Sequence, residues 1–153
     1  MKRPLVIGLG NDFRHDDGAG RIAARRVREL AGDIVRVIEE SGEGAALMDA
    51  WRGAEVVMLI DAVHSGAEPG TIHRMDPQAE PIPTNFFHYS THAFSVAEAV
   101  ELARALGQLP QRLILYGIEG KDFTSGQGLS AEVAAAAEQV AQTITADLCT
   151  KCR

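Results

Sequence analysis

The feature that most constrains the fold is an alternation of two hydrophobic patterns along the chain. Short apolar runs rich in Val, Ile and Leu alternate with longer segments whose apolar residues recur at helical spacing. The short runs predict strands at 4–9, 34–38, 56–60, 70–75 and 113–116, and the longer segments predict helices at 18–30, 43–51, 92–106 and 130–148. Such alternation is typical of βαβ units, so we predict an α/β fold around a largely parallel sheet. Ligand-binding groups are then expected where strands end.

Length and composition fit one domain. With 153 residues, 46% of them apolar and 24% charged, the chain can bury a substantial core. We expect the domain to span 1–148 and a short tail to occupy 149–153. The formal net charge of −6 argues against a general nucleic-acid-binding protein, which needs a basic face. A cluster of four arginines in the first predicted helix is expected to be a solvated face: Arg21, Arg25, Arg26 and Arg28.

Neither a membrane span nor a redox site is predicted. No apolar run approaches the roughly 20 residues of a membrane span. The apolar stretch near the N-terminus ends at Asn11, which is too early for a secretory signal, so we expect a cytoplasmic protein. Cys149 and Cys152 have the C-x-x-C spacing of redox and zinc motifs, but no second pair and no following helix accompany them. We interpret them as two thiols in a tail.

The segment after the first predicted strand is rich in glycine and contains adjacent carboxylates. It resembles a dinucleotide-binding loop, but Phe13 occupies the position of the third glycine, and Asp16 and Asp17 would repel a phosphate. Acidic residues often stabilise the first turn of a helix, which explains one of the two. The glycines on both sides of the pair indicate close approach of the backbone and tight packing of the helix on the sheet. We therefore regard this loop as a candidate site.

Two further residues extend this candidate site. Asp61 follows the buried run 56–60, where a carboxylate is costly unless it is paired or bound to a ligand; a turn-forming role is the alternative. His92 is expected to begin a helix, with a structural role as the alternative. Together Asp17, Asp61 and His92 offer two oxygens and one nitrogen, a set that suits a divalent first-row metal ion. Motifs for a serine or cysteine nucleophile are missing, so hydrolysis here depends on metal-activated water or carboxylate acid–base chemistry.

Four short motifs, in this order along the chain, resemble the [NiFe]-hydrogenase maturation endopeptidases: Gly8-Leu9-Gly10-Asn11, Asp16-Asp17-Gly18-Ala19-Gly20, Ile60-Asp61-Ala62 and Ser90-Thr91-His92. The resemblance implies a three-layer fold, in which a twisted, mostly parallel five-stranded sheet has helices on both faces. It also implies one activity, removal of a C-terminal extension from the hydrogenase large-subunit precursor after nickel insertion. Asp17, Asp61 and His92 match the family's metal-contacting residues. The nickel is implied to belong to the substrate and to signal that loading is complete.

Several roles stay open at this stage. Asp16 is expected to shape the loop, and a role as a base is the alternative. Glu119 and Asp122 are candidates for binding the substrate tail, with a solvated loop as the alternative. The segment 76–90 is expected to contact substrate through Phe86, Phe87 and Tyr89, and the alternative is a patch that covers the sheet edge.

Two other functions remain as alternatives to a hydrogenase-processing protease. One is a generic metal-dependent amidase or peptidase, and the other is a non-catalytic metallochaperone for the hydrogenase precursor. The expected state is a monomer, because one cut on one partner needs no oligomer. His64 and His73 flank a turn and are expected at the surface.

Overall fold

The computed structural model describes residues 2–83, 86 and 94–151. The strands are β1 (Leu5–Leu9), β2 (Arg36–Glu40), β3 (Val56–Val63), β4 (Ile72–Met75) and β5 (Arg112–Glu119), and the α-helices are α1 (Ala19–Ala31), α2 (Gly44–Trp51), α3 (Val96–Ala105) and α4 (Ala131–Lys151). Two short 3₁₀-helices, η1 (His15–Gly18) and η2 (Gly32–Ile34), flank α1. The alternation of strands and helices predicted from the sequence is therefore confirmed. None of the helices in the described ranges combines the length and the apolar character needed to cross a membrane.

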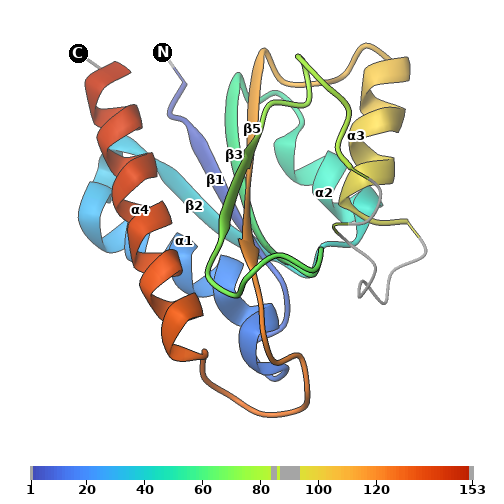
Figure 1. Cartoon of the computed structure of the whole chain (residues 1–153). Helices are drawn as coiled ribbons and strands as arrows, with labels where there is room; N and C mark the ends of the chain where they lie inside the picture. Colours follow the sequence, from blue (N-terminus) through green and yellow to red (C-terminus); the bar gives the residue numbers. More distant parts are fainter. Residues whose placement is uncertain (1, 84–85, 87–93, 152–153) are drawn as a thin grey trace.

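The five strands form one sheet in the order β2-β1-β3-β5-β4 (Figure 1). All neighbouring pairs are parallel except β4, which runs antiparallel to β5 at the edge. The mostly parallel sheet is thus confirmed, and the strand predicted at 70–75 lies at its edge. The chain leaves β1 toward one edge and leaves β3 toward the other, so the crevice between the carboxyl ends of these two strands is a switch point of the kind where ligands bind.

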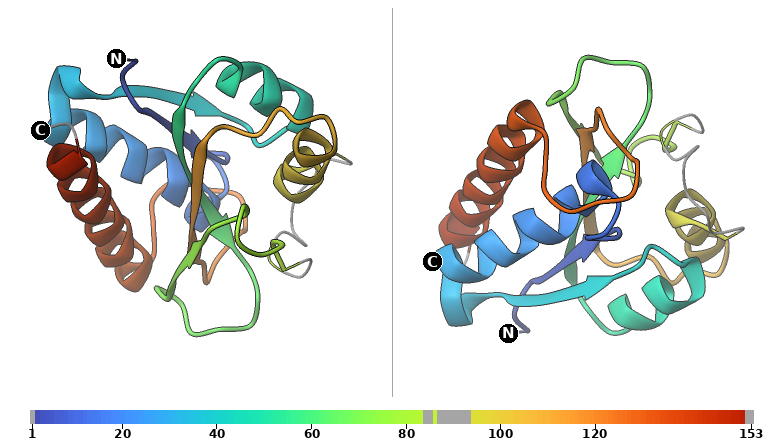
Figure 2. Two further views of the ribbon diagram at one scale, coloured as in Figure 1. Left: turned by 90° about the horizontal axis from the view of Figure 1, so that it is seen from above. Right: turned by 90° about the horizontal axis from the view of Figure 1, so that it is seen from below.

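Helices cover both faces of the sheet and make three layers (Figures 1 and 2). Helices α1 and α4 pack on one face, while α2 and α3 pack on the other. Successive side chains of β3 alternate between the two cores: Met58 and Ile60 pack with α1 and α4, whereas Val57 and Leu59 pack with α2 and α3. A strand covered on both sides reads as one continuous apolar run, which is why 56–60 was recognisable from the sequence.

Two glycines let α1 lie unusually close to the sheet. A Cβ atom on Gly20 would lie 2.2 Å from the carbonyl oxygen of Ile60, and one on Gly8 would lie 2.6 Å from the Cβ of Ala24. Neither separation is possible between real atoms, so both positions need glycine. The predicted tight packing of this helix is confirmed, and the first turn of α1 lies directly against the ends of β1 and β3.

Two elements have boundaries that differ from the prediction. Strand β3 does not stop at residue 60 but continues to Val63, because β5 pairs with it along its full length and brings Asp61 opposite Gly117. Asp61 therefore lies within the strand rather than behind it. Helix α3 begins at Val96 instead of 92, because Ser95 is the N-cap and forms a capping box with Glu98. His92 itself lies outside the described residues.

The C-terminal helix is longer than predicted. It continues to Lys151 because no glycine or proline interrupts the alanine-rich segment that starts at Ala131. Cys149 is consequently a half-buried helical residue and not part of a tail. Cys152 lies outside the described residues, so the role of the C-x-x-C spacing stays a prediction.

Candidate active site

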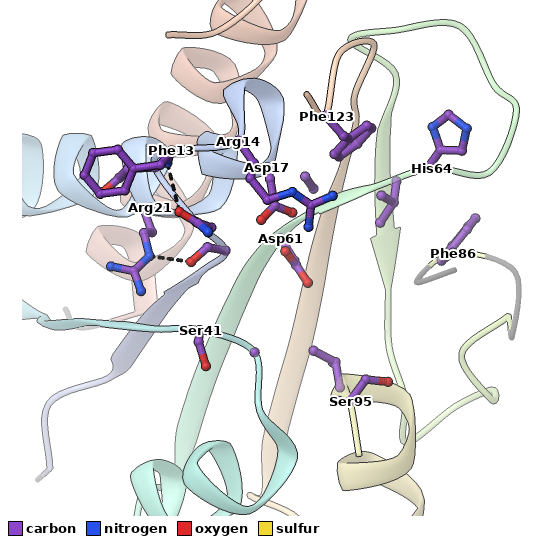
Figure 3. A pocket seen from close by; sticks show the side chains of 17 residues that line it. Phe13, Arg14, Asp17, Arg21, Ser41, Asp61, His64, Phe86, Ser95 and Phe123 are labelled. Carbon is purple, nitrogen blue, oxygen red and sulfur yellow. Dashed lines mark hydrogen bonds between the residues drawn. The ribbon is translucent and has the colours of Figure 1, made fainter. Parts of the chain in front are cut away.

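A pocket of about 390 Å³ opens at the carboxyl ends of β1 and β3 (Figure 3). The loop that follows β1 forms one wall, and the end of β3 forms the floor. Asp17 and Asp61 both line the pocket, together with Phe86 and Phe123 on the side toward β5. The structure thus brings together two of the three residues that the sequence analysis chose as metal-contacting, although 44 positions separate them along the chain.

The carboxylates of Asp17 and Asp61 interact unfavourably when both are charged. Asp61 is 8% exposed, while Asp17 is half-buried. Burial, and then the negative charge of Asp17, raise the pKa of Asp61 well above its ordinary value. A pair of this kind is stabilised by a proton or by a cation that binds to both groups. The arrangement is therefore suited to acid–base chemistry or to contact with a metal ion.

Asp16, the neighbour of Asp17, has a different environment. It is fully buried, and its carboxylate accepts four hydrogen bonds from the loop after β5: from the N–H groups of Lys121 (2.8 Å), Asp122 (2.9 Å) and Ser130 (2.8 Å), and from the hydroxyl of Ser130 (2.8 Å). Burial alone would raise the pKa of Asp16, but the hydrogen bonds outweigh it and lower the pKa below its ordinary value. Asp16 is therefore a charged residue that holds this loop in place, and it does not line the pocket.

Only two of the three predicted metal ligands lie among the described residues. Asp17 and Asp61 supply two carboxylates, and no group of three His, Cys, Asp or Glu side chains suited to a metal ion occurs among the described residues. His92, Phe87 and Tyr89 lie outside those residues, so their expected roles stay predictions.

Glu119 is not part of a solvated loop, whereas Asp122 lies partly exposed in the loop after β5. Glu119, at the end of β5, is 1% exposed and accepts hydrogen bonds from the N–H and the hydroxyl of Ser65 and contacts His73 Nε2 at 3.2 Å. The surface position expected for His73 is wrong, because its ring packs between Glu119 and Phe86. The carboxylate of Asp122 accepts hydrogen bonds from the N–H and the hydroxyl of Thr124 and so shapes its own turn.

His64 also lies away from open solvent. It is half-buried, lines the pocket and meets the ring of Phe123 edge-on, with 5.5 Å between the ring centres. The surface position expected for this histidine is therefore wrong as well. The reason is that β3 continues to Val63, so His64 comes directly after the strand and lies in the wall of the pocket.

Comparison with known proteins identifies the family to which the chain belongs. The family model HycI, hydrogenase maturation protease, matches residues 23–147 of the chain. The chain belongs to the hydrogenase maturation protease family. It is 31% identical over 117 residues to the hydrogenase expression/formation protein HupD of Thiocapsa roseopersicina, a match that covers 75% of this chain but 53% of that relative. The chain thus spans about half the length of that relative.

Other members of the hydrogenase maturation proteases match along nearly their whole length. A putative hydrogenase maturation protease of Methanocaldococcus jannaschii is 29% identical, with 94% of this chain and 95% of that protein covered. Among solved structures, the hydrogenase maturating endopeptidase HybD from Escherichia coli has the same fold, with a TM-score of 0.83, 24% identity and coverage of 98% and 94%. HybD from Thermococcus kodakarensis gives a TM-score of 0.66 at 28% identity, with coverage of 96% and 99%.

The arginines of α1 are partnered within the protein. The cluster on α1 is not a bare solvated face, because carboxylates or carbonyls engage each member. Arg21 donates to the carbonyl of Gly10, Arg25 binds Asp12 and Glu39, Arg26 binds Glu29 and Glu138, and Arg28 donates to the carbonyl of Val37. A nucleic-acid role for this cluster is therefore not supported.

Arg14 is the pocket residue that the sequence analysis missed. It lies three positions before Asp17, and the structure places its side chain in the pocket with both acids (Figure 3). The available signal was a single arginine inside a loop rich in glycine and acidic residues. Phe86, in contrast, was chosen from the sequence for substrate contact, and it does line the pocket.

Proposed function

We propose that the chain is an endopeptidase that removes the C-terminal extension of a nickel-loaded [NiFe]-hydrogenase large-subunit precursor. The observation that carries this proposal is the acid pair at the switch point of the sheet, formed by the half-buried Asp17 and the buried Asp61. Membership of the hydrogenase maturation proteases supplies the reaction and the class of substrate. The generic amidase and the non-catalytic metallochaperone are disfavoured by that membership.

In the proposed reaction, the nickel arrives as part of the substrate. Asp17, Asp61 and His92 would contact it while the precursor still holds it, so that only a loaded precursor is fixed in the pocket. When both carboxylates are ionised, as a bound cation favours, their charge of −2 matches a divalent ion. Weak affinity of the free protease for nickel is useful here, because a site already filled with metal cannot report whether the precursor is loaded.

Hydrolysis then depends on carboxylate chemistry, which makes the enzyme an aspartyl-type endopeptidase. The negative charges of Asp17 and Asp61 repel each other, and burial favours the protonated form of Asp61. One carboxylate of the pair accepts a proton from the attacking water, and the same pair returns a proton to the leaving amine. Asp16 acts indirectly, since its four hydrogen bonds fix the loop 121–130 beside Asp17.

The proposal includes where and how the protein works. We propose that it acts in the cytoplasm as a monomer, and that segment 76–90 guides the substrate toward the acids. Phe86 supports the last point, because it is half-buried on the wall of the pocket and its ring packs at a tilt against His73, with ring centres 4.7 Å apart.

The test compares nickel-loaded with nickel-free precursor of the cognate large subunit. Purified protein is added to each, and the mass of the precursor is followed by mass spectrometry. Loss of a C-terminal peptide from the loaded form alone is the expected result. Cleavage of both forms would keep the protease but remove nickel sensing from the acid pair, and cleavage of neither would favour a chaperone.

A single substitution tests whether Asp61 takes part in the reaction. Asp61→Asn should fold but should not process the precursor, because the pair loses the carboxylate that exchanges protons. Asp33→Asn is the matched control, since Asp33 is exposed in η2, outside the pocket. Normal processing by Asp61→Asn would show that this carboxylate has no part in the reaction.

A further inference from the structure

Arg14 is held in place through its backbone rather than through its side chain. Its N–H donates to the carbonyl of Asn11 (3.3 Å), and its own carbonyl accepts from the N–H of Asp17 (3.0 Å). Arg14 also forms a parallel β-bridge with Gly126, where the N–H of His15 donates to the carbonyl of Gly126 (2.8 Å). The start of the side chain therefore has a fixed position relative to Asp17.

The guanidinium group of Arg14 points into the pocket beside Asp17 and Asp61 (Figure 3). Within the described part of the chain it forms no hydrogen bond and no ion pair within 4.0 Å. The other arginine that lines the pocket, Arg21, is occupied instead, because it donates to the carbonyl of Gly10 at 2.7 Å and to Glu39 at 3.4 Å. Arg14 thus has donors available for a group that enters the pocket.

A half-buried guanidinium that faces a pair of acids without binding them leaves space between the opposite charges. A substrate group placed in that space meets proton acceptors on one side and a fixed positive charge on the other. An amide bond under attack needs this combination, since a base must take a proton from water while negative charge develops on the carbonyl oxygen.

We propose that Arg14 is a catalytic residue that stabilises the negative charge on the carbonyl oxygen of the scissile bond. This inference rests on the proposed function and adds the electrophilic group to it. Arginine suits the role because it stays charged at every relevant pH and presents several N–H donors in a planar fork.

The step balances with water as the only co-reactant. A carboxylate of the acid pair takes one proton from water, the water oxygen forms a bond to the carbonyl carbon, and the carbonyl π electrons move onto the oxygen that faces Arg14. That electron pair then re-forms the carbonyl while the C–N bond breaks, and the nitrogen takes the proton held by the acid pair. The products are a new carboxyl terminus and the amine of the released peptide.

The experiment measures kcat and KM for nickel-loaded precursor with wild type, Arg14→Ala, Arg14→Lys and the control Arg36→Ala. Arg36 is an exposed residue at the start of β2, at the end of the sheet opposite to the pocket. We expect Arg14→Ala to lower kcat by roughly 10²–10³-fold with little change in KM, as removal of a donor to an oxyanion does. Arg14→Lys should retain an intermediate kcat, and Arg36→Ala should match wild type.

Chemical rescue separates catalysis from structure. Millimolar guanidinium chloride should restore part of kcat to Arg14→Ala and none to Asp61→Asn, because only the first variant lacks a guanidinium group. Urea unfolding should give equal midpoints for wild type and Arg14→Ala, since the side chain has no bond to lose.

Three results would overturn the inference. The first is kcat of Arg14→Ala within twofold of wild type, and the second is a change confined to KM. The third is a loss of kcat that guanidinium does not rescue at any concentration below the unfolding transition. If wild type leaves the loaded precursor intact, the proposed function itself fails, and the role of Arg14 fails with it.

Discussion

Replacing Asp16 by Asn tests whether a buried charge holds the loop after β5 in place. The two side chains have the same shape, so the change removes only the charge and one acceptor oxygen. In the native protein, Oδ1 accepts from the N–H of Ser130, while Oδ2 accepts from the N–H groups of Lys121 and Asp122 and from the hydroxyl of Ser130. All four donors lie on the loop 121–130.

The cost follows from this geometry. An asparagine NH2 group at the Oδ2 position would face two backbone donors, so the better orientation puts it at Oδ1, against the N–H of Ser130. One charge-assisted hydrogen bond, worth about 1.5–3 kcal/mol, is then lost and a buried donor stays unsatisfied, at a further cost of about 1–3 kcal/mol. We expect the free energy of unfolding to fall by about 3–5 kcal/mol, out of a total of about 5–15 kcal/mol for a typical domain.

Urea denaturation at pH 7 measures this loss, with Asp33→Asn as the control for removing an exposed charge from η2. The control should stay within about 0.5 kcal/mol of wild type. By thermal unfolding, the loss corresponds to a fall of about 2–4 °C in Tm per kcal/mol for a chain of this size. A loss below about 1 kcal/mol for Asp16→Asn would refute the reasoning.

The same variant has a defined pH dependence. Because the pKa of Asp16 is lower in the folded than in the unfolded protein, its contribution to stability is complete above the unfolded pKa of about 3.9. That contribution is lost as the pH falls through the folded pKa. The stability difference between wild type and Asp16→Asn should therefore be constant from pH 7 to about pH 5 and become smaller below about pH 4. A difference that grows on acidification would contradict the sign.

Three further substitutions test the rest of the site and fold by urea unfolding. Because burial raises the folded pKa of Asp61, ionising it opposes folding, so Asp61→Asn should be more stable than wild type at pH 7, by a margin that closes toward pH 4; equal stability at pH 7 would contradict this. Gly20→Ala should cost about 3 kcal/mol or more, since its Cβ would overlap the carbonyl of Ile60; a neutral change would refute the close packing. Ser95→Ala should cost about 1 kcal/mol through loss of the α3 capping box, whereas no loss would argue against it.

The sequence was sufficient for the architecture because local patterns and global packing agree. The run 56–60 is apolar throughout since both faces of β3 are covered, and the glycines around residues 8–20 are needed where α1 contacts the sheet. Element ends were less predictable. Asp61 belongs to the strand because β5 pairs beside it, and α3 starts at Val96 because of a capping box with Glu98. Both depend on partners that no local pattern reveals.

Prediction of the site was limited for the same reason. Asp17 and Asp61 were selected because carboxylates at strand ends are unusual, and the parallel sheet does place them in one pocket. The lowered pKa of Asp16 and the raised pKa of Asp61 could not be predicted from the sequence, since each depends on the groups that surround the carboxylate. Arg14 escaped notice because an arginine in a loop is ordinary until its surroundings show that its charge is not used elsewhere.

The close contact of α1 with the strand ends has a consequence for how this enzyme can diversify. Asp61 is embedded in a strand, and Asp17 precedes a helix whose glycine touches the main chain of that same strand at Ile60. The spacing between the two acids is therefore set by backbone contact and not by loop length. If segment 76–90 guides the substrate as we propose, a new precursor preference can be engineered by exchanging that segment between relatives, while the spacing of the two acids stays unchanged.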